Sequence, residues 1–145
     1  MRTSAIFRST RSYGLLLTTL LLSSVLLADD LTDSNSLVCY GWSASVCSIE
    51  GECENTAPWQ LDMPDFLRLD LRARIVTSTE TAPEERVTEI QTLVRENGTI
   101  VLQGREGERA YSWLIVEATG EGTLTMSTPG EGITVFTLCT PTENL

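Results

Sequence analysis

The sequence predicts an all-β protein, in which an antiparallel meander forms a small β-barrel or sandwich after an N-terminal signal peptide. Three observations support this fold class. Apolar and charged residues alternate over residues 66–75, which is typical of a half-buried strand. The dipeptide Asn97-Gly98 is a strong hairpin signal, because a type I′ turn requires positive φ at both central residues. Turn signals recur roughly every 8–12 residues, which is the spacing of sandwiches and barrels.

Residues 1–28 have the three-part layout of a secretory signal peptide. Three arginines precede an apolar run over residues 14–27, and the small residue Ala28 follows. The run holds 14 residues, whereas a membrane-spanning helix needs about 20. We therefore expect cleavage after Ala28, a single disulfide-stapled β domain over residues 29–145, and a periplasmic or secreted location without stable membrane insertion. An uncleaved anchor stays open, because Leu26 stands where a small residue is preferred.

The chain is strongly acidic. It contains 20 acidic residues and 10 basic ones, all of them arginine, and it has no lysine and no histidine. Loss of the three leader arginines leaves seven basic against 20 acidic residues, a net charge of −13. Such a surface repels phosphate backbones and anionic membranes, so we expect no nucleic-acid partner. A cationic partner stays open beside the simpler interpretation that the charge keeps the domain soluble.

Four cysteines lie in the predicted mature domain. An even number in an exported protein indicates disulfides, and three pairings are possible. We favour Cys47–Cys53, which closes a short loop, and Cys39–Cys139, which ties the first strand to the last. The gaps of seven, five and 85 residues do not suit a four-cysteine zinc site, which uses two close pairs.

The first half of the mature chain mixes strands with irregular segments. We predict a polar, loose segment over residues 29–36 and a first strand over residues 37–42. Residues 43–58 carry two cysteines, a glycine and three acids, which indicates a constrained loop. Residues 66–75 are predicted as one long strand that bends or bulges.

Residues 81–95 are ambiguous between helix and strand. Thr81 and Pro83 resemble a helix start. Against this, β-branched residues share one face of the segment at a period of two, and the hairpin signal at Asn97-Gly98 follows directly. We therefore predict a strand, and the helix stays open.

The C-terminal part is predicted as a run of hairpins. Turn signals at residues 104–109, at residues 119–122 and at Pro129-Gly130 separate short apolar segments. Sequential strands joined by short turns pair with their neighbours, so we expect a closed or nearly closed meander. The expected strands cover residues 99–103, 110–117, 123–128 and 133–139.

The residue types restrict the chemistry of this domain. Without histidine, the Ser-His-Asp and Cys-His devices are impossible and the common histidine metal sites are absent. Without lysine, no Schiff base forms. Glu50, Glu52 and Glu54 offer carboxylates for calcium or for acid–base work, but a solvated acidic loop is the simpler interpretation. We expect no enzyme activity, no catalytic residue, no cofactor and no metal.

Two aromatic pairs have two interpretations. Tyr40 and Trp42 are two residues apart, as are Tyr111 and Trp113, so each pair shares a face of a strand. The four rings line a ligand pocket at a barrel mouth or belong to the core. The core is the simpler interpretation, and the four residues are the candidate ligand-facing set.

Short motifs over most of the mature chain form a recognisable layout. They are Cys39, Cys47 and Cys53, then Leu102-Gln103-Gly104, Trp113 and Ile115, Ala118-Thr119-Gly120, Thr123 and Thr125, and Phe136 with Cys139-Thr140-Pro141. This layout resembles a family of small, uncharacterised secreted proteins of alphaproteobacteria. The resemblance implies secretion and a β-rich fold. It implies no activity, cofactor, substrate or functional residue.

Three functions are compatible with the sequence. We first expect an exported, non-catalytic β domain that binds a protein or a cell-envelope component, because the stapled scaffold lacks the usual catalytic residue types. A small β-barrel that binds a small apolar ligand is the alternative suggested by the aromatic pairs. A carboxylate-based hydrolase ranks third.

Overall fold

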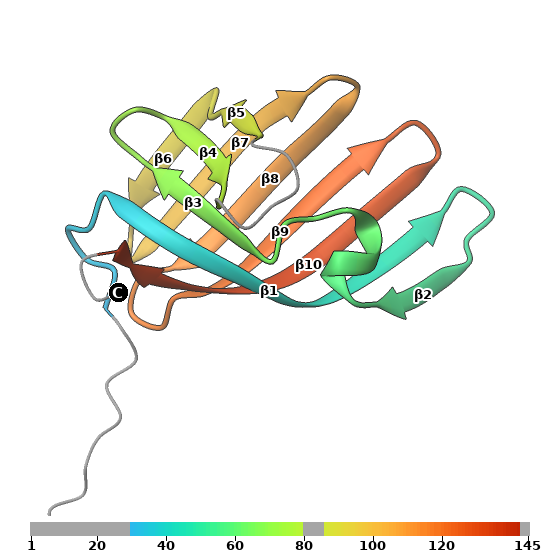
Figure 1. Cartoon of the computed structure of the whole chain (residues 1–145), viewed down its shortest axis with the longest axis horizontal. Helices are drawn as coiled ribbons and strands as arrows, with labels where there is room; N and C mark the ends of the chain where they lie inside the picture. Colours follow the sequence, from blue (N-terminus) through green and yellow to red (C-terminus); the bar gives the residue numbers. More distant parts are fainter. Residues whose placement is uncertain (1–29, 80–85, 143–145) are drawn as a thin grey trace, which may run out of the picture.

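The computed structural model describes residues 30–79 and 86–142, and antiparallel strands make up most of this part of the chain (Figure 1). Its elements are β1 (Ser36–Ser48), β2 (Cys53–Thr56), the 3₁₀ helix η1 (Pro58–Leu61), β3 (Phe66–Asp70), β4 (Ile75–Ser78), β5 (Val87–Glu89), β6 (Thr92–Glu96), β7 (Thr99–Glu106), β8 (Arg109–Val116), β9 (Glu121–Thr128) and β10 (Glu131–Pro141). The predicted all-β antiparallel class is confirmed. The predicted signal peptide lies outside the described residues.

The described strands form one sheet that curls into a half-barrel (Figure 1). Its order is β5-β4-β3-β1-β10-β9-β8-β7-β6, and β2 pairs with β1 beside this path. From β6 to β10, each strand pairs with the next, as a meander requires. The edge strands β5 and β6 follow each other in the chain, and the Gln91 amide between them donates to the Gln103 carbonyl of β7 (2.9 Å). The two edge strands of the half-barrel are therefore linked by a short connection that lies against β7.

The core fills the concave face of the half-barrel. Side chains alternate between the two faces along each strand. On β7 and β8 the inward residues Ile100, Leu102, Trp113 and Ile115 are buried, which agrees with the interpretation of Trp113 as a core residue. Burying one such side chain stabilises the fold by about 1.5–3 kcal/mol. The neighbouring strands add the fully buried Leu37, Leu69 and Val135.

The first strand is longer than predicted, and the loop predicted over residues 43–58 is wrong. β1 continues to Ser48 across a bulge, and β2 folds back onto its second half. Gly51 provides the turn with φ 84°, a value that glycine adopts without steric cost. The two cysteines that suggested a loop lie opposite each other on β1 and β2, so they clamp a hairpin.

The long strand predicted over residues 66–75 is a hairpin of β3 and β4. The Asp70 Oδ1 accepts a hydrogen bond from the amide of Ala73 (2.7 Å), and Arg74 adopts φ 56°. An aspartate that bonds the following backbone is a turn device. Leu71 lies in the turn, outside both strands, and yet its side chain is buried. The alternation of apolar and charged residues in the sequence therefore runs through the turn without a break. Periodicity therefore concealed the reversal.

The described part of the ambiguous segment forms strands and not a helix, but they are two short strands, β5 and β6, separated by Ile90 and Gln91. Residues 81–85 lie outside the described residues. Asn97 and Gly98 have φ values of 53° and 74°, and both values are positive, as a type I′ turn requires. The next turn is shorter than predicted. It comprises residues 107–108, so Gly104 is a strand residue.

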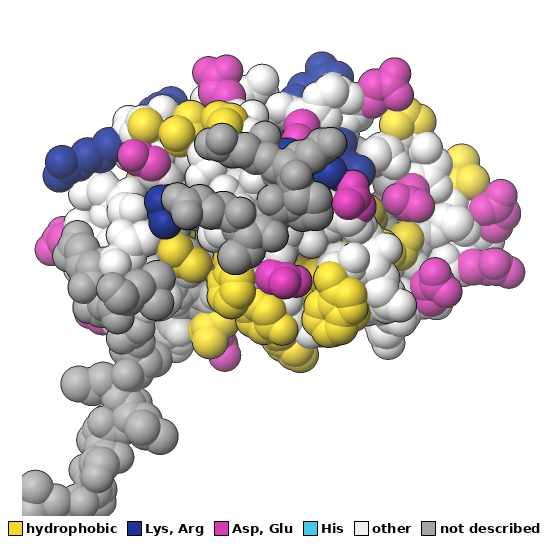
Figure 2. All heavy atoms as spheres, in the orientation of Figure 1, with side chains coloured by type: hydrophobic (Ala, Val, Ile, Leu, Met, Phe, Trp, Pro, Cys, Tyr) yellow, Lys and Arg dark blue, Asp and Glu magenta, His cyan; other side chains and the backbone are white. Residues whose placement is uncertain are grey.

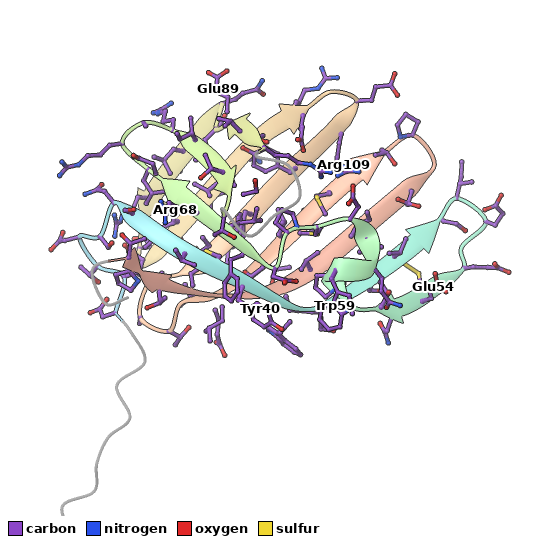
Figure 3. The ribbon with its side chains drawn as sticks, viewed as in Figure 1. Tyr40, Glu54, Trp59, Arg68, Glu89 and Arg109 are labelled. Carbon is purple, nitrogen blue, oxygen red and sulfur yellow. A yellow bond between two sulfur atoms is a disulfide. The ribbon has the colours of Figure 1, made fainter. Side chains whose placement is uncertain are left out.

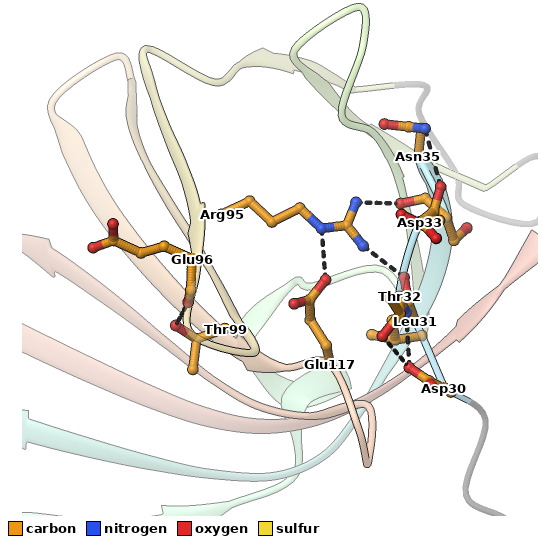
Figure 4. Close-up of polar contacts among 10 residues, drawn as sticks. Asp30, Leu31, Thr32, Asp33, Asn35, Arg95, Glu96, Thr99 and Glu117 are labelled. Atoms are coloured by element: carbon orange, nitrogen blue, oxygen red, sulfur yellow. Dashed lines mark hydrogen bonds and ion pairs between the residues drawn. The ribbon is translucent and has the colours of Figure 1, made fainter.

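The segment over residues 30–35 is fixed, in contrast to the loose segment predicted (Figure 4). Arg95 on β6 donates to the carbonyl oxygens of Ser34 and Leu31, both at 2.7 Å. Its Nε also donates to Glu117 Oε1 at 2.5 Å. The amino-acid composition of the segment gave no sign of this anchoring, because Arg95 binds the backbone carbonyl groups of the segment and not its side chains.

Both predicted disulfides form. Cys39 and Cys139 lie opposite each other on β1 and β10, with their Cα atoms 4.0 Å apart. Cys47 and Cys53 lie opposite each other on β1 and β2, with their Cα atoms 4.1 Å apart. The two disulfides are compatible with an oxidising extracellular compartment.

Candidate functional site

A small cavity opens on the concave face beside the β7–β8 turn. Its volume is about 80 Å³. Two of the four candidate aromatics, Tyr111 and Trp113, contribute to its wall. The structure therefore supports the predicted inward position of this pair.

Tyr111 forms one side of the cavity and fixes the curl of the sheet. Its ring lies against Gly104, the residue opposite it on β7, and its Oη donates to the Glu89 carbonyl at the end of β5 (2.9 Å). A Cβ at Gly104 would lie 2.6 Å from that Oη and from the Glu89 oxygen, so this position requires glycine. Burial, assisted by the negative charges of Glu106 and Glu89, raises the pKa of Tyr111 to about 12. The phenol is therefore a neutral donor at physiological pH.

Trp113 is fully buried at the base of the cavity. Its Nε1 donates to Thr137 Oγ1 on β10 (3.0 Å) and passes over Gly122 on the strand between them. A Cβ at Gly122 would lie 2.6 Å from the Thr137 oxygen, so a side chain there would block the bond. The bond pairs two polar groups that would otherwise be unsatisfied in the core. Trp113 is therefore a fixed part of the wall.

Tyr40 and Trp42 project from the outer face of β1, so the preferred interpretation as core residues is wrong for this pair, and they do not line the cavity of Tyr111 and Trp113. Trp42 is the extra residue of the bulge, because Gly41 and Ser43 are paired with β10 and Trp42 is not. A bulge re-aims the side chain that it inserts. Trp42 is 58% exposed as a result.

Tyr40 and Trp42 belong to a larger apolar area on the outer face, which we call the outer patch. Its members are Tyr40, Trp42, Phe66, Leu114, Phe136 and Leu138. Each of these side chains is between 37% and 58% exposed. Figure 2 shows apolar side chains gathered along the lower margin of the molecule, and Figure 3 places Tyr40 there.

Ring contacts and strand register connect the outer patch. The rings of Tyr40 and Phe66 are 5.4 Å apart, and Leu138 lies opposite Tyr40 on β10. The rings of Trp42 and Phe136 are 5.8 Å apart. Leu114 shares a shallow hollow with these last two rings. The patch therefore spans β3, β1, β10 and β8 without depending on flexible loops.

The acidic residues considered for calcium binding lie elsewhere. Glu50, Glu52 and Glu54 are exposed around the tip of the β1–β2 hairpin. Figure 2 shows acidic side chains spread over this end of the molecule. Within residues 30–79 and 86–142, no three Cys, His, Asp or Glu side chains converge on a site that would hold a metal ion.

Comparisons with protein-family models, with curated proteins and with solved structures find no match to this chain. In the described part of the chain, no helix is long and apolar enough to cross a membrane. The resemblance to secreted alphaproteobacterial proteins stays a prediction. The cavity and the outer patch are therefore the two candidate binding surfaces of the described residues.

Sequence reasoning missed most of the outer patch, although a signal for it exists. Leu114 lies between the inward residues Trp113 and Ile115, and Phe136 lies between the inward residues Val135 and Thr137. The inward side chains of such a strand already form the core. A large apolar residue at an outward position therefore adds nothing to the core. Several such positions on adjacent strands indicate an interaction surface.

Proposed function

We propose that this protein is an exported, non-catalytic β domain that binds a polypeptide partner through the outer patch. The observation that carries the proposal is the contiguous exposure of six large apolar side chains from four strands of one sheet face. Soluble proteins rarely expose such an area unless another molecule covers it. Four of the six residues are aromatic, and aromatic residues are enriched where protein interfaces are centred.

The expected partner carries basic groups around an apolar centre. The chain has a net charge of −10, and Glu121 borders the hollow between Trp42 and Phe136. A second copy of this chain would bring the same negative charge to the contact, which opposes association. A partner with Lys or Arg at its rim would be attracted to this surface.

Export and the absence of catalysis have separate support. The two disulfides suit an oxidising compartment. The chain has no histidine and no lysine, so the commonest general bases and amine nucleophiles are missing. A lipid-sized ligand is less well supported, because the cavity of about 80 Å³ is smaller than typical ligand pockets of roughly 300–1,000 Å³.

Photocrosslinking tests the proposal. A photoreactive phenylalanine analogue replaces Leu114 in the outer patch, and in the control it replaces Val94, which is exposed on β6. In an extract of the producing cells, we expect position 114 to yield an adduct with a basic protein. Position 94 should yield none, and the substitutions Trp42→Ala and Phe136→Ala should abolish the adduct.

Three outcomes would overturn this assignment. They are equal adducts at both positions, no adduct at position 114, and an adduct of twice the mass of the protein. The last outcome would identify a second copy as the occupant. Added salt should weaken capture of the expected basic partner, since it screens the attraction between unlike charges.

A further inference from the structure

The cavity on the concave face combines an apolar wall with charged groups at its mouth. Met63, Leu67, Val76 and Met126 line it together with Trp113. Its volume of about 80 Å³ is roughly half that of an engineered cavity of about 150 Å³ that admits benzene. The space therefore suits a short branched aliphatic group.

An open vestibule of about 310 Å³ adjoins this cavity. Arg86, Glu106 and Arg109 line both spaces, so the same charged side chains border the cavity and the vestibule. Figure 3 shows Arg109 reaching over the concave side of the sheet. A ligand with its apolar end in the cavity would place its other end among these charged side chains.

Two of these three charged side chains have no partner among the described residues. Arg86 donates to the Asp62 carboxylate (2.7 Å) and to the Asp62 carbonyl (3.2 Å). In contrast, the side chains of Arg109 and Glu106 form no hydrogen bond or ion pair within residues 30–79 and 86–142. They come from positions opposite each other on β8 and β7. One cation and one anion are therefore presented at the same mouth.

We propose that this cavity binds a free α-amino acid with a short branched aliphatic side chain. The side chain occupies the apolar cavity, the carboxylate pairs with Arg109, and the ammonium group pairs with Glu106. A guanidinium binds a carboxylate with two parallel hydrogen bonds, which fixes the orientation of the ligand. A zwitterion uses both charges of the mouth, whereas a simple acid or amine leaves one of them without a partner. This site lies on the opposite face from the outer patch, so it is independent of the proposed partner.

Calorimetric titration of the mature, disulfide-bonded protein tests the proposal with three probes. They are L-leucine, 4-methylpentanoate, which lacks the ammonium group, and 3-methylbutylamine, which lacks the carboxylate. We expect leucine to bind at least tenfold more tightly than either analogue. This expectation rests on the strength of charge-assisted hydrogen bonds at both ends of the ligand.

Charge-neutral variants separate the two roles. In Arg109→Gln, the preference for leucine over the amine should disappear, and in Glu106→Gln the preference over the acid should disappear. The matched controls Arg105→Gln and Glu96→Gln change exposed residues that do not line the cavity, and they should bind leucine like the wild type. Failure of leucine, valine and isoleucine to bind would overturn the proposal. So would equal affinity for all three probes, or leucine binding that neither cavity variant alters.

Discussion

At the scale of single residues, two glycines determine where two aromatic side chains of the core lie. Tyr111 occupies the space that Gly104 leaves on the neighbouring strand, and the Trp113 indole passes over Gly122 to reach Thr137. In both cases the aromatic group also donates a hydrogen bond to a more distant strand. Each glycine therefore permits a polar link across the sheet that a larger residue would block.

Tyr111 provides a direct test of this arrangement through its pKa of about 12, against an ordinary value of 10.0. In a near-ultraviolet titration, the wild type should show a phenolate step near pH 12 that is missing in Tyr111→Phe. The raised pKa also predicts how stability depends on pH. The unfolded chain loses the phenol proton first, so stability is intact below pH 10 and falls as pH rises toward 12.

The same titration can contradict the assignment. If the late step survives in Tyr111→Phe, another group produces it, and Tyr111 is not the buried donor to Glu89. Chemical denaturation at several alkaline pH values supplies the second readout. The decline of stability between pH 10 and 12 should be smaller in the variant than in the wild type.

At the scale of elements, the segment before β1 is part of the fold. Leu31 is fully buried, and its amide donates to the Glu117 carbonyl (2.9 Å). At the start of the segment, hydrogen bonds from the side chain and the amide of Thr32 hold the pKa of Asp30 below its ordinary value. Residues 30–35 are therefore structured by contacts with β6 and with the β8–β9 turn.

Arg95→Met should destabilise the protein by about 1–3 kcal/mol, because it leaves the largely buried Glu117 carboxylate and two backbone carbonyls without their donor. Urea denaturation measures the loss. Arg105→Met is the matched control, since Arg105 is exposed on β7, and it should change stability by less than about 0.5 kcal/mol. Equal effects of the two substitutions would show that the Arg95 contacts contribute little.

Sequence reasoning succeeded where a glycine marks the turn. Gly98 and Gly130 both adopt positive φ at turns that were predicted. It failed at the turn between β3 and β4, which contains no glycine and where Arg74 adopts positive φ. L-residues with side chains enter that region rarely, so composition gives no warning.

The outer patch was missed for a different reason. Its large apolar side chains resemble core residues in the sequence, and only the three-dimensional arrangement of the strands shows that they point outward. The bulge in β1 adds to this only at Trp42, which has no partner in the register with β10. Tyr111 and Trp113, on a strand without such an irregularity, were placed on the correct face. The sequence therefore predicted the inner wall better than the outer surface.

At the scale of the whole molecule, β1 connects the parts of the fold. It pairs with β10, β3 and β2, and it carries one cysteine of each disulfide. The Cys39–Cys139 bond joins the first strand to the last, whereas Cys47–Cys53 joins the two strands of one hairpin. The two bonds therefore constrain the unfolded chain to very different extents.

Replacing Cys39 and Cys139 with alanine should cost about 4–5 kcal/mol of stability, and replacing Cys47 and Cys53 should cost about 2 kcal/mol. The difference follows from loop entropy, since the bonded residues are 100 positions apart in the first pair and 6 in the second. Thermal or urea unfolding of the two double variants measures both losses. Small domains have about 5–15 kcal/mol of stability in total, so the first variant should lie close to unfolding. Similar losses in both variants would contradict the entropic account and show that local packing of each bond dominates.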